Sequence, residues 1–317
     1  MAMPNQKDVV VIGIDTGNRC MKTVSQIMVA GLYGSDQKPA VHDGNMIRYR
    51  GAYYMPSTDR AAYRRNKTED DTYFILSLFA IVSELKLRGI PYGKDEVTPK
   101  VALAVGLPPA HMSKQKAAFR EYFNRGVVQF EYNDIPAQIE IVDVFVFVQG
   151  LSAITSEQKL LKSQEVAYIV DIGGYTTDVI CVERGVVNPN TVISEDAGMI
   201  HLYNHIKDEL NLLYDDVPKE QQIDRLLSDP DYELEQGMKA VAEKTAAAYV
   251  DNLLRRLHEK GISLRLSKGF FVGGGASRLM KHIYLSSLVR DPVVISDIRA
   301  NAIGYEALAL RIMAKKK

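Results

Sequence analysis

An aspartate followed by glycine and polar residues comes directly after a short apolar segment near the start of the chain. Residues 9–14 (VVVIGI) predict a buried strand, and Asp15-Thr16-Gly17-Asn18 follows it as a turn. Glycine lets backbone N–H groups approach an anion, while Thr16, Asn18 and Lys22 add donors and Asp15 can hold a hydrated divalent cation. The spacing indicates a phosphate-binding turn, although an ordinary hairpin turn capped by Asp15 has the same composition.

The same construction recurs in the second half of the chain. Residues 166–170 predict another buried strand, and residues 171–178 (DIGGYTTD) follow it with a second glycine and a second carboxylate. Two acid-ended turns that face one another can clamp a polyphosphate and its metal ion from both sides. Two unrelated turns are the alternative. Neither segment is a P-loop, since the chain contains no GxxxxGK[ST] pattern.

Three glycines follow a third apolar strand, in the segment Val272-Gly273-Gly274-Gly275-Ala276-Ser277. A glycine run lets a flat group lie against the backbone. A triplet by itself indicates a tight turn, but its place after two phosphate-type turns favours contact with a nucleoside.

The elements that must position these motifs alternate between strands and helices. Apolar spacing of three and four predicts a helix at residues 72–88, and Asn133-Asp134 predicts a hairpin between strands 127–132 and 137–142. A helix is predicted to begin at Gln149, others at residues 198–213 and 234–260, and the last at 300–313. Both halves open with strand, Asp-x-Gly and strand. We therefore predict an α/β protein of two duplicated domains with a cleft between them.

Composition excludes several other classes of protein. The 317 residues include 39 basic and 39 acidic side chains, so no overall positive field for nucleic acid exists. No stretch reaches the roughly 18 apolar residues of a membrane helix. Residues 1–8 contain no apolar signal-peptide core, and two cysteines form no disulfide framework. These features predict a cytoplasmic protein without a membrane partner.

The three motifs, in this order, resemble the phosphate-1, phosphate-2 and adenosine motifs of the actin-like ATPase superfamily. That superfamily includes actin, the large heat-shock chaperones, sugar kinases and bacterial cytoskeletal actins. The resemblance covers about residues 8–312, with 149–153 and 300–304 similar to the two connecting helices. Val105-Gly106-Leu107-Pro108 and the chain length are similar to plasmid-partition actins of the ParM/StbA type.

The resemblance implies an actin-like ATPase fold, with mixed sheets flanked by helices and a nucleotide cleft between the domains. Domain I is expected at 1–149 plus about 304–317, with a smaller subdomain near 33–98. Domain II is expected at 150–303, with a helical subdomain near 205–262.

The resemblance also implies roles for single residues. Asp15 and Asp171 are expected to hold a hydrated magnesium ion. Gln149 is expected to orient the attacking water, with Asp171 and Asp178 as the acids of the catalytic site; a helix-capping role is the alternative for Gln149. The residues expected to line the phosphates are Thr16, Gly17, Asn18, Lys22, Gly173, Gly174, Tyr175 and Thr176. Those expected to contact the nucleoside are Gly273, Gly274, Gly275 and Ser277, with Lys207, Glu209 and Lys244 as further candidates.

The function implied is nucleotide-dependent polymerisation, with ATP or GTP hydrolysis and Mg²⁺. The bulky Arg19-Cys20-Met21 segment and Tyr175 leave the base preference open. The implied partners are other copies of the chain and a DNA-binding adaptor protein through which filaments segregate plasmid DNA. The alternatives are a monomeric sugar-type kinase, another bacterial cytoskeletal actin and a non-hydrolysing nucleotide-binding scaffold. The pair His201/His205 has metal-binding spacing, but a surface helix is favoured because no HExxH pattern accompanies it.

Overall fold

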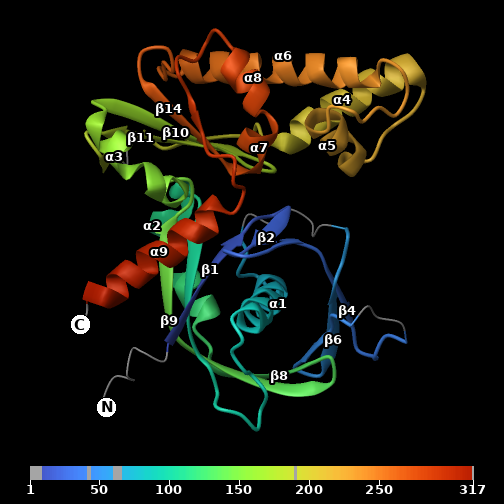
Figure 1. Cartoon of the computed structure of the whole chain (residues 1–317), viewed down its shortest axis with the longest axis vertical. Coiled ribbons are helices and arrows are strands. Elements are labelled where there is room, and N and C mark those ends of the chain that lie inside the picture. Colours follow the sequence, from blue (N-terminus) through green and yellow to red (C-terminus); the bar gives the residue numbers. More distant parts are fainter. Residues whose placement is uncertain (1–8, 41–43, 60–65, 189–190, 316–317) are drawn as a thin grey trace. The chain divides into compact units, whose positions relative to one another are not determined.

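A computed structural model describes residues 9–40, 44–59, 66–188 and 191–315 of the chain. Residues 1–8, on which the expectation of a missing signal segment rests, lie outside this part. The chain divides into unit 1, residues 1–153 and 299–317, and unit 2, residues 154–298. Figure 1 shows both units, which are described separately below. Within the described residues, no helix combines the length and the apolarity needed to cross a membrane.

Unit 1 is built on a nine-stranded sheet with the order β3-β2-β1-β7-β9-β8-β5-β6-β4. Its strands are β1 (Val9–Thr16), β2 (Cys20–Lys22), β3 (Ile27–Val29), β4 (Leu32–Ser35), β5 (Ile47–Tyr49), β6 (Ala52–Pro56), β7 (Lys100–Leu107), β8 (Gly126–Tyr132) and β9 (Ile135–Val148). Its helices are α1 (Thr72–Leu87), η2 (Pro109–His111), α2 (Met112–Phe123) and α9 (Ala300–Lys315), and η3 (Ser152–Glu157) begins at its boundary. Strands β1, β7 and β9 are parallel neighbours, so their carboxyl ends lie at one edge of the sheet.

Helices cover both faces of this sheet. Helix α1 is buried over most of its length, and the sheet curls around it in Figure 1. On the opposite face of the sheet, α9 packs Tyr305 against Val11 and Ala102. A Cβ atom on Gly106 would lie 1.9 Å from the Tyr305 hydroxyl, so only glycine allows this close approach. The two helices therefore fix the strands that carry Asp15 and Gln149.

Unit 2 contains a smaller mixed sheet with the order β12-β11-β10-β14-β15, and β13 pairs with β11. Its strands are β10 (Val166–Ile172), β11 (Thr177–Glu183), β12 (Val186–Val187), β13 (Ile193–Glu195), β14 (Lys268–Val272) and β15 (Val293–Val294). Its helices are α3 (Gln158–Ser163), α4 (Met199–Tyr214), α5 (Glu220–Ser228), α6 (Met238–Glu259), α7 (Gly273–Arg278) and α8 (Met280–Leu285). One core joins the sheet to α4, α6 and α7. The mixed sheets with flanking helices confirm the predicted α/β class.

The structure differs from the local predictions at Gln149 and at helix α5. Gln149 does not begin a helix: it lies in a turn after β9, because its N–H donates to the Leu107 carbonyl at 2.9 Å and Gly150 has φ +77°. The glycines at 273–275 form the first turn of a short helix, α7, which is followed by α8. Helix α5 was missed, since its two buried residues, Ile223 and Leu226, make too short an apolar pattern to predict a helix.

Candidate functional site

The predicted turn of unit 1 joins β1 to β2, and its residues Asp15 and Lys22 form an ion pair. Asp15 lies opposite Lys22 in the antiparallel register. The Lys22 ammonium donates to Asp15 Oδ2 at 2.9 Å, with side-chain exposures of only 14% and 6%. The structure thus brings together a predicted phosphate ligand and a predicted metal ligand, bonded to each other. A phosphate that binds Lys22 competes with this ion pair.

The other residues of this turn are held in place by α1 and by tight backbone geometry. A Cβ atom on Gly17 would lie 2.6 Å from the Cys20 carbonyl oxygen, so the turn requires glycine. The Tyr73 hydroxyl of α1 donates to Asn18 Oδ1 at 2.7 Å. Thr16 is 1% exposed, and its hydroxyl has no hydrogen-bond partner among the residues that the structure describes. A buried hydroxyl without a partner costs about 1–3 kcal/mol. Thr16 is therefore a ready hydrogen-bonding group for a ligand.

A second lysine, which the sequence analysis missed, lies beside this turn. The Lys67 ammonium donates to the Thr16 carbonyl and lies 5.2 Å from the centroid of the Tyr73 ring. Burial lowers the pKa of Lys67 to about 8; nearby Asp15 opposes the shift and Lys22 adds to it. Lys67 precedes α1 in a polar segment, and nothing in its spacing connects it to residue 16. Only the folded chain reveals this group.

Gln149 lies at the same edge of the unit 1 sheet as the turn. It follows β9, whose last residue Val148 pairs with Leu107 at the end of β7, and β7 is the parallel neighbour of β1. The Gly150 N–H donates to Asn301 Oδ1 at 2.9 Å, so α9 fixes the turn that carries Gln149. The half-buried Gln149 is thus positioned by backbone bonds rather than by a helix start.

The predicted loop of unit 2 joins β10 to β11 and is anchored by the start of α4. The carbonyls of Gly173, Gly174 and Tyr175 accept N–H groups from Met199, Ile200 and Gly198 at 2.9–3.0 Å. In a trans peptide the C=O and the following N–H point in opposite directions. The N–H groups of residues 174–176 therefore point away from α4, as three successive amides. Such a row of amides is a binding site for an anion.

Two acidic residues flank this loop in direct register. Asp171 and Asp178 lie opposite one another on β10 and β11, and both side chains are buried. The Thr176 hydroxyl donates to Asp178 Oδ2 at 3.3 Å. Carboxylates opposite one another repel when both are ionised. A divalent cation near Asp171 offsets that repulsion, and oxygen ligands of this kind suit Mg²⁺.

The glycine motif lies beside Asp171. Strand β14 runs parallel to β10 with Val272 opposite Asp171, and α7 starts at the next residue. A Cβ atom on Gly273 would lie 2.4 Å from Asp171 Oδ1, and Gly273 has φ +91°. Unit 2 therefore brings Asp171, Asp178, the 173–176 loop and the glycine motif to one end of its sheet. Ser277, further along α7, is half-buried.

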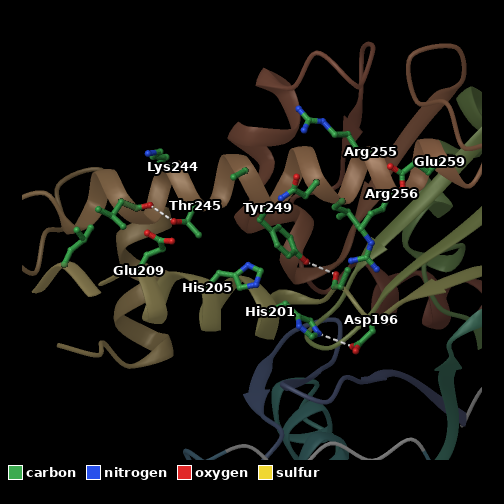
Figure 2. A pocket seen from close by; sticks show the side chains of 16 residues that line it. Asp196, His201, His205, Glu209, Lys244, Thr245, Tyr249, Arg255, Arg256 and Glu259 are labelled. Atoms are coloured by element: carbon green, nitrogen blue, oxygen red, sulfur yellow. Dashed lines mark hydrogen bonds and ion pairs between the residues drawn. The ribbon is translucent and has the colours of Figure 1, made fainter. Parts of the chain in front are cut away.

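A separate pocket lies between α4 and α6 in unit 2. It has a volume of about 860 Å³. Figure 2 shows His205 and Glu209 of α4 opposite Thr245 and Tyr249 of α6, while His201 Nε2 contacts Asp196 Oδ1 at 3.0 Å. Of the further nucleoside candidates, Glu209 and Lys244 line this pocket and Lys207 does not. None of the predicted phosphate-binding residues lines it.

The two sheets, each with an aspartate and a glycine turn at the end of a central strand, define a protein with the actin-like fold. A family model described as the C-terminal part of the archaeal MreB-like actin homologues matches residues 169–284. A comparison with curated proteins finds no significant match. The resemblance to actin-like proteins stated from the motifs is confirmed at the level of the fold.

Solved structures with this fold cover nearly the whole chain at low identity. The archaeal actin homologue Ta0583 superposes with a TM-score of 0.77 at 17% identity, over 95% of this chain and 99% of that one. A subunit of the 15-stranded ParM filament from Clostridium botulinum gives 0.71 at 19% identity, over 95% and 99%. ParM from Bacillus thuringiensis with ATP gives 0.65 at 14% identity, over 97% and 100%.

Proposed function

We propose that this chain binds a nucleoside triphosphate with Mg²⁺, hydrolyses it and assembles into filaments. The observation that supports this best is the row of amides at residues 174–176, flanked by the buried carboxylates of Asp171 and Asp178. Backbone amides select for phosphate, and paired acids select for a hard cation next to it. Unit 1 supplies a second turn of the same construction, with Asp15, Thr16 and Lys22.

In this proposal each residue of the turns has a distinct task. Lys22, which is paired with Asp15, would bind a phosphate oxygen, and the Asp15 carboxylate would hold the metal ion through water. Thr16, Gly17 and Asn18 add donors in unit 1, as Gly173, Gly174, Tyr175 and Thr176 do in unit 2. Gly273, Gly274, Gly275 and Ser277 contact the nucleoside, for which ATP and GTP are both candidates.

Magnesium fits the chemistry of the available donors. The described residues contain no cluster of three or more acidic, histidine or cysteine side chains that would enclose a metal ion. Mg²⁺ is usually held by one or two carboxylates together with phosphates and several waters. Asp15 and Asp171 meet that need through water. The bound ion would neutralise the phosphate charge.

Hydrolysis in this proposal depends on positioning rather than on a strong base. Gln149 has a neutral amide, which can orient a water through one donor and one acceptor. Asp178, hydrogen-bonded to Thr176, orders the phosphate loop from the other strand. Such an arrangement is sufficient in principle, because phosphoryl transfer is catalysed mainly by positioning and by stabilisation of charge.

Assembly is proposed because some of the matched structures with this fold are filaments. One matched structure is a 15-stranded ParM filament, another is described as an Alp12 filament, and Ta0583 has been solved in complex with ADP. By analogy, this chain would form filaments of its own in the cytoplasm. A DNA-binding adaptor that links the filament to plasmid DNA is the finer part of this proposal.

One assembly assay tests the proposal. The purified chain is mixed with MgATP or MgGTP, and light scattering, pelleting and phosphate release are followed together. We expect sedimentable polymer only with a triphosphate, followed by loss of scattering as phosphate is released. A chain that remains monomeric, and whose phosphate release rises when a sugar is added, would instead be a small-molecule kinase. Nucleotide binding with neither polymer nor phosphate release would indicate a scaffold.

A further inference from the structure

Two lysine ammonium groups, those of Lys22 and Lys67, lie near Asp15 in the turn of unit 1. Asp15 is paired with Lys22 at 2.9 Å. Lys67 makes no ion pair with a carboxylate in the part of the chain that the structure describes; its ammonium donates to the Thr16 carbonyl and lies over the Tyr73 ring. Charges withdrawn from water are retained at a cost unless a partner balances them. Two ammonium groups near one carboxylate favour the binding of an anion at this turn.

Two neighbouring groups support the same reading. The hydroxyl of Thr16, the residue whose carbonyl Lys67 contacts, is buried and has no hydrogen-bond partner among the described residues. Tyr73 serves two groups of this site at once: its hydroxyl donates to Asn18 and its ring faces the Lys67 ammonium. One aromatic side chain therefore orients both the tip of the turn and the additional lysine.

We propose that Lys67 is a phosphate-binding residue, whose ammonium contacts the phosphate groups of the nucleotide beside the turn of Thr16. Tyr73 is the residue that positions it. This inference rests on the proposed function, because it assigns a further ligand to the same nucleotide. It differs from a purely structural role, in which Lys67 only holds the Thr16 carbonyl and stabilises the empty turn.

The test uses variants that separate the charge of Lys67, its hydrogen bonding and its position in the fold. Lys67→Met removes both the charge and the donor, Lys67→Gln keeps a donor without the charge, and Lys67→Arg keeps both. Lys86→Met is the matched control, because Lys86 also faces a tyrosine ring, that of Tyr132 at 4.1 Å, but belongs to no predicted phosphate-binding segment. Calorimetry with MgATP, MgADP, pyrophosphate and adenosine measures affinity, and urea unfolding of the nucleotide-free chain measures stability.

We expect Lys67→Met and Lys67→Gln to weaken MgATP, MgADP and pyrophosphate binding by about 10- to 100-fold, the usual effect of losing a hydrogen bond from a charged group. Adenosine affinity should not change, and Lys67→Arg and Lys86→Met should bind nearly as the wild type does. The inference is overturned if Lys67→Gln binds MgATP and pyrophosphate as tightly as the wild type does. It is also overturned if affinity falls only in variants whose nucleotide-free chain has lost stability. Should Lys67→Met fail to fold, the comparison of Gln with Arg decides. A wild-type chain that binds neither nucleotide nor pyrophosphate overturns the proposed function itself, which is a distinguishable result.

Discussion

Replacing Gly273 by alanine should damage unit 2 and its acidic site together. With φ +91°, Gly273 adopts a conformation that costs an L-residue about 1–2 kcal/mol. The new Cβ atom would lie 2.4 Å from Asp171 Oδ1 and 2.7 Å from the Ile172 carbonyl oxygen. The carboxylate must therefore move by about 1 Å to reach an ordinary contact distance of 3.4 Å. Overpacking of this kind costs about 1–3 kcal/mol.

The expected loss for Gly273→Ala is thus about 2–5 kcal/mol in the free energy of unfolding. Gly274→Ala is the matched control for stability, because a Cβ atom there meets nothing within 4 Å and its φ lies outside the left-handed region. Alanine in place of glycine in a helix usually gains up to about 1 kcal/mol. Equilibrium unfolding in urea, followed by circular dichroism, compares the two variants with the wild type.

The same variant reports on the proposed metal site. Displacement of Asp171 should weaken MgATP binding at least tenfold. This is measured by calorimetry without urea, at a temperature at which the variant is folded. The reasoning is refuted if Gly273→Ala unfolds at the same urea concentration as Gly274→Ala and binds MgATP like the wild type. In that case neither the left-handed backbone nor the contact with Asp171 constrains position 273.

Three further changes test two residues of the site and Glu84, a buried acid of α1. Gln149→Ala should slow phosphate release about tenfold, which corresponds to a barrier raised by about 1.4 kcal/mol, with unchanged MgATP affinity. Equal rates of phosphate release in the variant and the wild type would mean that Gln149 is only a turn residue. Lys22→Ala should weaken nucleotide binding and cost about 3 kcal/mol of stability, because it removes the ion-pair partner of the buried Asp15. Lys22→Ala combined with Asp15→Asn should recover most of that stability. Burial would raise the pKa of Glu84, but hydrogen bonds from Thr23, Arg88 and Ser25 hold it below its usual value. The ionised form of Glu84 therefore stabilises the fold above the pKa that this group has in the unfolded chain, and the contribution disappears on acidification. Glu84→Gln should cost about 2 kcal/mol of stability at pH 7. In acid titrations the stability of this variant should fall less than that of the wild type below about pH 4.

The elements that depend on local pattern could be predicted from the sequence. Helix α1 was predicted at 72–88 and occupies Thr72–Leu87, because its apolar spacing and the glycine after it are local signals. The hairpin about Asn133-Asp134 was found for the same reason: both residues adopt positive φ, which asparagine and aspartate tolerate. The aspartate–glycine turns were located correctly at strand ends.

The contacts that complete the candidate site could not be predicted, because they join residues far apart in the chain. Lys67 reaches Thr16 across 51 positions, and Tyr73 reaches Asn18 across 55. The anchoring of the 173–176 loop by the start of α4 depends on a return of the chain after β13. Gln149 was placed on a helix because its neighbours suit one, but the end of β7 accepts its N–H instead. Tertiary hydrogen bonds decided these positions.

The chain order has a consequence for how the protein is made. Unit 1 consists of residues 1–153 and 299–317, so its last helix leaves the ribosome after all of unit 2. Until then the Gly13 N–H lacks Glu306, Arg88 lacks one of its two carboxylates, and the face of Val11 and Ala102 has no cover. At about 5–20 residues per second, synthesis of residues 154–298 takes roughly 7–30 s. During that interval unit 2 emerges as one continuous segment, while the first part of unit 1 has an exposed apolar face. Exposed apolar surface of this kind makes a nascent chain prone to aggregation, so this is the stage at which a chaperone would help most.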